Sequence, residues 1–150
     1  MNNSSEDLQS LSSSLSKKEL KTIYKKIVWL VESDLEISVE KIYGDNSYWV
    51  PTPDFEIEEL ELFGVIEIGD DQTIFEKIIS LAHEVGHCIL HKEKTFNQIN
   101  CVLFTEAVAW YLGFLYFQGL GFKIDLNEYQ EATAQALDLY RRSLNERDVK

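Results

Sequence analysis

Apolar residues recur every three to four positions in four stretches of the chain, which predicts amphipathic helices over 17–33, 74–91, 100–118 and 126–145. Three of these stretches begin with a capping box, in which a polar side chain and an acidic side chain three residues later each accept a hydrogen bond from the other's backbone N–H. The pairs are Ser16 and Glu19, Thr73 and Glu76, and Asp125 and Glu128. The stretch 100–118 is apolar nearly all round, which is typical of the central helix of a compact domain.

Between the first two helices the apolar positions alternate with a period of two, which predicts short strands within 36–70. Leu62–Ile68 is the best strand candidate, and we expect it at the edge of a small twisted sheet. Five carboxylates precede it and are typical either of a charged edge strand or of a groove for a basic substrate: Asp54, Glu56, Glu58, Glu59 and Glu61. Residues 1–15 are rich in Ser and Asn, which predicts a flexible N-terminal tail before a single domain over 16–148. The alternative is an extra helical turn docked on the domain, because Leu8, Leu11 and Leu15 fall at helical spacing.

The composition narrows the classes of protein. With 150 residues, 45% hydrophobic and 27% charged, the chain is typical of a one-domain globular protein. It carries 14 Lys and Arg against 26 Asp and Glu, and the resulting net charge of −12 disfavours nucleic acid as a direct partner. The first residues lack the basic and apolar regions of a secretory signal, so we expect a cytoplasmic protein without a membrane anchor. The two cysteines, Cys88 and Cys101, are too few for a disulfide framework, and we expect both to be buried.

Residues 83–87 have the pattern H-E-x-x-H and fall inside the helix predicted over 74–91. Residues four apart lie on one face of a helix, so the imidazoles of His83 and His87 can converge on a single Zn²⁺ ion. Glu84 lies about 100° further round the helix, beside the ion rather than on it. There its carboxylate can take a proton from a water bound to the ion and pass it to a leaving amine. The alternative is a pair of surface histidines without a metal.

A catalytic zinc ion needs a third protein ligand and an open position for water. His91 is eight residues from His83, about 12 Å along an unbroken helix, so we expect it to pack beside the site instead of binding the ion. Cys88 points about 100° away from the preceding histidine, towards the core. Glu106 remains, because an ionised carboxylate in the apolar stretch 100–118 is costly unless it is paired or bound to a metal. The alternative for Glu106 is a carboxylate that reaches solvent or pairs with a Lys or Arg.

These segments resemble the gluzincin metallopeptidases, and most closely the ImmA/IrrE family. Residues 83–91 read HEVGHCILH, similar to that family's H-E-[LIV]-G-H-x-x-L-H stretch, and residues 106–110 read EAVAW, similar to its E-A-x-x-F stretch. Val108 stands where the family often has Asn, and the Leu-Met-Pro sequence usual after this point is absent. The resemblance covers about residues 16–118 and implies that His83, His87 and Glu106 are the zinc ligands and Glu84 the catalytic base.

We therefore expect an α+β, zincin-like domain with an N-terminal helix, a small sheet, the H-E-x-x-H helix, a buried glutamate helix and a C-terminal helix. We expect a zinc-dependent endopeptidase, and the resemblance implies a regulatory substrate such as a helix-turn-helix repressor. The strand Leu62–Ile68 would border the cleft and pair with an extended substrate peptide. The residue that stabilises the oxyanion stays open among Tyr43, Tyr48, Tyr111 and Tyr116. The alternative function is a metal-binding protein that regulates a repressor or toxin partner without cleaving it.

Overall fold

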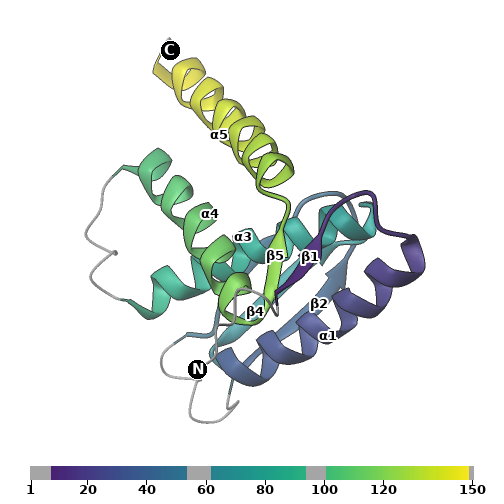
Figure 1. The fold of residues 1–150 in the computed structure, drawn as a ribbon. Coiled ribbons are helices and arrows are strands. Elements are labelled where there is room, and N and C mark those ends of the chain that lie inside the picture. The colour runs from purple at the N-terminus through teal and green to yellow at the C-terminus, as the bar shows by residue number, and fades with distance from the viewer. Residues whose placement is uncertain (1–7, 54–61, 94–100, 149–150) are drawn as a thin grey trace.

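Helices and short strands make up an α+β fold, as the sequence predicts (Figure 1). The computed structural model describes residues 8–53, 62–93 and 101–148. Within these ranges the elements, in chain order, are β1 (Gln9–Leu11), α1 (Lys17–Leu35), β2 (Ile37–Ile42), β3 (Tyr48–Pro51), β4 (Gly64–Gly69), α3 (Ile74–Lys92), α4 (Val102–Gly119), β5 (Phe122–Ile124) and α5 (Leu126–Asp148). Each predicted helix is present within three residues of its expected bounds.

The three-stranded sheet has the order β2-β4-β3. The central strand β4 runs parallel to β2, with Gly64 opposite Ile37, and antiparallel to β3, with Glu67 opposite Tyr48. The prediction that Leu62–Ile68 is an edge strand which pairs with a substrate peptide is therefore wrong, because β2 and β3 already occupy both of its sides. The acidic segment that precedes this strand, with its two alternative interpretations, lies outside the described residues.

A second, two-stranded sheet ties the N-terminal segment to the rest of the fold. β1 pairs in parallel with β5, with Leu11 opposite Ile124, and the side chain of Leu11 is fully buried. Within the described part of the chain, residues 9–11 therefore form a packed strand instead of the predicted flexible tail, and residues 1–7 lie outside that part. The backbone N–H of Ser13 also donates to the carboxylate of Glu128.

The helix starts follow from the capping chemistry. At Ser16 and Thr73 both hydrogen bonds of the capping box are formed. At α5 only half of the predicted box is present, because Asp125 accepts from the N–H of Glu128 while the Glu128 carboxylate binds Ser13. The carboxylate of Glu128 thus makes a contact with a distant residue that the local sequence pattern does not reveal.

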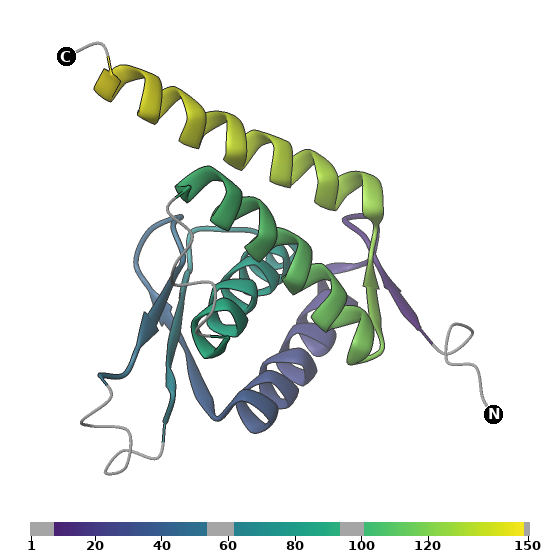
Figure 2. The ribbon, with the colours of Figure 1, turned by 90° about the vertical axis from the view of Figure 1, so that its left-hand side faces the viewer.

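The central helix of the fold is α3. Ten of its residues are buried, against four in α4, and it contacts α1, α4, β3 and β4. Figure 2 shows α3 with the three-stranded sheet on one side and α4 crossing over it. The prediction that 100–118 is the central helix is wrong: α4 is buried along one face only, where it packs on α3. No helix in the described ranges is long and apolar enough to span a membrane.

Candidate metal centre

The two histidines of the H-E-x-x-H pattern lie on the face of α3 that turns towards α4. Their spacing of four residues puts them one above the other on the helix, and the Nε2 atoms of His83 and His87 are 3.0 Å apart. Both side chains are partly buried, with exposed fractions of 15% and 21%. The two imidazoles are therefore held close together at the contact between the two helices.

Glu106 reaches this pair from α4. Its Oε1 atom is 3.1 Å from the Nε2 of His83, and its Oε2 atom is 2.8 Å from the Nε2 of His87. One ligand atom from each of the three residues lies within 4.8 Å of the others, so the group could hold a metal ion. The structure thus brings together the three residues that the sequence suggests as ligands, from segments about twenty residues apart.

With Glu106 ionised, the hydrogen atoms of this group cannot all be accommodated without a cation. For Glu106 to accept from both imidazoles, each Nε2 must carry a hydrogen. The two N–H groups would then face each other across the 3.0 Å between the nitrogens. If instead one Nε2 keeps its lone pair, that nitrogen and a Glu106 oxygen are two acceptors in contact. A cation accepts lone pairs from all three atoms at once, which removes the conflict.

The spacing also fits Zn²⁺. Two ligands with bonds of about 2.0–2.1 Å at a tetrahedral angle lie about 3.3–3.4 Å apart. The distances between the Glu106 oxygens and the histidine nitrogens are 2.8 and 3.1 Å, so a small outward movement of each side chain would suffice. Two imidazoles and one carboxylate form a donor set that catalytic zinc sites use.

The carboxylates of Glu84 and Glu106 beside His83 favour a positively charged group at this position. Burial acts to lower the pKa of His83, but the hydrogen bonds and negative charges of Glu106 and Glu84 outweigh it and raise the pKa to about 9. Burial likewise acts to raise the pKa of Glu106, whereas its hydrogen bonds to His83 and His87 lower the pKa to about 2. Two carboxylates thus concentrate negative potential on a few shielded atoms, which a divalent cation would neutralise.

Glu84 is the most deeply buried charged residue in the part of the chain that the structure describes, with 6% of its surface exposed. Its Oε2 atom lies 3.3 Å from the Nδ1 of His83, on the side of the imidazole ring opposite Nε2. In this position the carboxylate can accept the Nδ1–H and leave the Nε2 lone pair free for an ion. A role as base would require the same carboxylate to turn towards the open position of the ion.

Two glycines allow α3 and α4 to approach closely at this point. A Cβ atom on Gly86 would lie 1.8 Å from the carbonyl oxygen of Ala109, and a Cβ atom on Gly113 would lie 1.9 Å from that of Ala82. The helices therefore touch backbone to backbone beside the three ligands. The sequence interpretation missed both glycines, although a glycine inside a helical pattern indicates a packing reason because it weakens the helix.

Trp110 is a further residue of the site that the sequence interpretation missed. Its ring stacks on the imidazole of His83, with centroids 4.3 Å apart and planes 12° from parallel. The hydroxyl of Tyr129, whose pKa is raised by burial and which stays protonated, donates to the backbone carbonyl of Trp110. The indole N–H of Trp110 is buried and has no hydrogen-bond acceptor among the described residues. Trp110 thus fixes the plane of one ligand.

The other residues considered from the sequence lie away from the three ligand atoms. His91 packs edge-on against Trp49 and Phe63, which confirms it as a packing residue. Cys88 is buried, and burial raises its pKa to about 12, whereas Cys101 is exposed, so the prediction of burial was correct for only one of the two.

The four tyrosines considered for the oxyanion differ in their surroundings. The hydroxyl of Tyr116 donates to Asp34, and burial and that carboxylate raise the pKa of Tyr116. Tyr43 is 97% exposed, and Tyr48 and Tyr111 are also exposed. Tyr116 therefore already has a partner for its hydroxyl, and the oxyanion-stabilising residue stays open.

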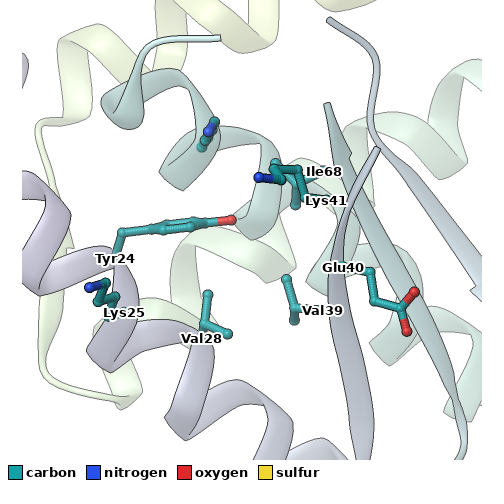
Figure 3. Close-up of a pocket in the computed structure, with 8 residues that line it drawn as sticks. Tyr24, Lys25, Val28, Val39, Glu40, Lys41 and Ile68 are labelled. Carbon is teal, nitrogen blue, oxygen red and sulfur yellow. The ribbon is translucent and has the colours of Figure 1, made fainter. Parts of the chain in front are cut away.

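A separate cavity of about 270 Å³ lies between α1 and β2 (Figure 3). The phenol of Tyr24 extends across it above Val28 and Val39, and Lys41 lies near the hydroxyl end of the ring. Burial and the nearby Glu32 raise the pKa of Tyr24 to about 12, so the phenol is neutral. The residues that line this cavity include none of the three candidate ligands.

Comparison of the chain with protein-family models, with curated proteins and with solved structures finds no match. The geometry of the described side chains is therefore the basis for any statement about what the protein does.

Proposed function

We propose that the protein is a zinc-dependent endopeptidase that hydrolyses a peptide bond in a protein substrate. The observation that carries the proposal is the convergence of His83, His87 and Glu106, from two helices, on a volume the size of one ion. The buried carboxylate of Glu84 directly beside this group supports a catalytic site over a structural one, because a structural site needs no base. A regulatory protein such as a helix-turn-helix repressor is the substrate that the sequence resemblance suggests.

Each residue has a distinct task in this proposal. His83, His87 and Glu106 hold Zn²⁺, which when bound supplies a Lewis acid and lowers the pKa of the attacking water. Glu84 takes the proton of that water and delivers it to the leaving amine nitrogen. For this step the Glu84 carboxylate, which lies 3.3 Å from Nδ1 of His83, would have to turn towards the substrate. Trp110 holds the His83 ring in its plane during that rotation.

Two substitutions at one position test the mechanism. Glu84→Gln keeps an oxygen that can accept the Nδ1–H of His83 but removes the base, so we expect one zinc per chain and no cleavage. Glu84→Ala also removes that acceptor, and we expect its zinc affinity to fall by about 10- to 100-fold. Glu131→Gln, an exposed carboxylate on α5, is the matched control. Glu106→Ala should bind zinc weakly.

The assay combines metal analysis with mass spectrometry of the cleavage products. The protein is purified without a chelator or a metal-affinity tag, and the substrates are helix-turn-helix regulators encoded beside its gene. Cleavage that persists in the Glu84→Gln variant would contradict the mechanism. Wild-type protein that takes up no zinc, even after zinc is added back, would contradict the metal site itself.

A second function is favoured by one observation. Glu84 contacts Nδ1 of His83, which is the position of a carboxylate that orients a metal ligand rather than that of a base. A metal-binding protein that regulates a repressor or toxin partner without cleaving it would use Glu84 in this way only. A stoichiometric complex that survives equally in the Glu84→Gln variant, with no cleavage products from the wild type, would select this second function.

A further inference from the structure

We propose that the groove between α4 and α5 docks the apolar face of a helical segment of a protein substrate. The inference rests on the proposed function, because it gives that function a substrate class. The groove has a volume of about 460 Å³. Its lining comes from the two helices and is almost wholly apolar: Ala107, Trp110, Tyr111, Phe114, Leu115, Leu126, Tyr129, Gln130, Thr133, Ala134 and Leu137.

The groove is uncharged in a highly charged protein. None of its lining residues is Asp, Glu, Lys or Arg, although these make up 27% of the chain. Near its far end, Asp138 of α5 forms ion pairs with Arg141 and Arg142, and the three side chains together carry one net positive charge. A charged ligand would find no oppositely charged partner among the lining residues. The apolar side chains of a ligand would instead be removed from water on binding, which favours the complex.

The groove and the candidate metal centre share the side chain of Trp110. Trp110 lines the groove and stacks on the imidazole of His83, so a single side chain forms a wall of both. Ala107, another lining residue, directly follows Glu106 in α4. Figure 2 shows α4 lying between α5 and α3. An occupant of the groove thus lies one helix away from the catalytic atoms.

The length of the apolar surface along both helices suits a short segment of polypeptide. Along α4 the lining spans Ala107 to Leu115, and along α5 it spans Leu126 to Leu137, which correspond to about 12 and 16 Å of helix. Large apolar side chains are also exposed on its rim, with exposed fractions of 62% for Tyr111, 43% for Leu115 and 47% for Leu126. Contiguous apolar surface of this kind marks protein interaction sites.

The backbone hydrogen bonding of α4 and α5 favours a helix as the occupant of the groove. The N–H and C=O groups of α4 and α5 are bonded within each helix, so the groove offers side chains and no free backbone partners. An extended peptide would bury unsatisfied backbone groups there, at a cost that its side chains would have to offset. A helix satisfies its own backbone and presents apolar residues at i, i+3 or i+4, and i+7, over about 11 Å. Two turns of helix match the length of the groove.

The test uses zinc-loaded protein with Glu84→Gln, which cannot cleave what it binds. A display library of 20-residue helix-forming peptides is the probe, and the affinity of selected peptides is measured by fluorescence anisotropy. Leu115→Glu and Leu126→Glu each place a charge at the groove, and we expect each to weaken binding at least tenfold. Leu139→Glu, at a 65% exposed leucine of α5 outside the groove, is the matched control and should change affinity less than twofold.

Zinc content is measured in every variant, since the groove variants should keep the ion. Equal affinity in Leu115→Glu and its parent, or no selected peptide at all, would overturn the proposal. Sedimentation that shows a wild-type dimer at micromolar concentration and a Leu115→Glu monomer would assign the groove to a second copy instead. If peptides bind through the groove but no protein carrying the selected helix is cleaved by the wild type, the endopeptidase proposal fails and the docking site stands.

Discussion

The close contact between α3 and α4 makes Gly86→Ala the most informative single substitution. The added Cβ atom would lie 1.8 Å from the carbonyl oxygen of Ala109, and real Cβ contacts are essentially never shorter than 3.0 Å. The two backbones must therefore separate by about 1.2 Å, the difference between these distances. Ala109 is three residues from Glu106 in a continuous helix, so Glu106 moves with it.

Such a movement is large compared with what a metal site tolerates. Ligand distances in a functional site stay within about 0.2 Å of their usual values, so a shift of about 1 Å displaces Glu106 from the ion. We expect Gly86→Ala to weaken zinc binding about 100-fold or more, since changes that merely reorient a ligand cost 10- to 100-fold. Overpacking costs about 1–3 kcal/mol, and the better helix propensity of Ala returns about 1 kcal/mol, so metal-free stability falls by about 0–2 kcal/mol.

Competition with a chromophoric chelator measures the zinc affinity, and urea denaturation of the metal-free protein measures the free energy of unfolding. Gly119→Ala is the matched control, because a Cβ atom at this exposed glycine of α4 would meet nothing within 4 Å. The control should bind zinc like the wild type. If Gly86→Ala also binds zinc like the wild type, the backbone contact does not set the position of Glu106 and the reasoning is refuted.

Two further predictions concern the metal and the N-terminal strand. Removing zinc with a chelator should lower the melting temperature in scanning calorimetry, since an ion at about 1,000 times its Kd stabilises the folded state by about 4 kcal/mol; an unchanged melting temperature would contradict a bound ion. Leu11→Ala should lower the free energy of unfolding by about 2–5 kcal/mol in urea denaturation, because Leu11 is fully buried. Ser10→Ala, at an exposed neighbour, is the control, and a loss below about 0.5 kcal/mol for Leu11→Ala would mean that β1 does not pack.

The helices could be predicted from the sequence because their signals are local. A capping box and an apolar period lie within one segment, so α1 and α3 begin at the residues that follow Ser16 and Thr73, as expected. The apolar period does not reveal what covers a helix. The stretch 100–118 is apolar all round, yet α3 covers one of its faces and the groove beside α5 leaves side chains such as Tyr111 exposed.

The sheets could not be predicted in the same way, because strand order depends on partners that are distant in the sequence. The alternation in β4 indicates a strand but does not distinguish an edge from a centre, and β2 and β3 both pair with it. Leu11 lies at helical spacing from its neighbouring leucines, yet the segment is a strand because β5, more than a hundred residues away, supplies its pairing partner. Non-local pairing thus decided the position of β4 within its sheet and overrode the local helical spacing at Leu11.

The candidate site likewise has residues that the local sequence predicts and contacts that depend on the fold. His83 and His87 follow from a local spacing, and Glu106 follows from the cost of an isolated carboxylate in an apolar stretch. The contact that unites them is not local, since it depends on Gly86 meeting Ala109 and on Trp110 stacking on His83. Gly86 and Gly113 can be recognised in the sequence as residues that weaken a helix. Their role, which is to let α3 and α4 touch, is seen only in the structure.

The helix crossing and the candidate metal centre are best understood as one structural unit. The glycine contacts hold α3 and α4 close together, and Glu106 lies against both histidines across this contact. While Glu106 is ionised, these groups cannot satisfy one another without a cation, because two Nε2–H groups would meet across 3.0 Å. The packing thus imposes a local conflict that a divalent ion resolves, and an unresolved buried polar conflict costs stability. The contact between α3 and α4 therefore also places three groups that could hold a metal ion. The Gly86→Ala measurement tests the helix contact, and the chelation measurement tests the ion.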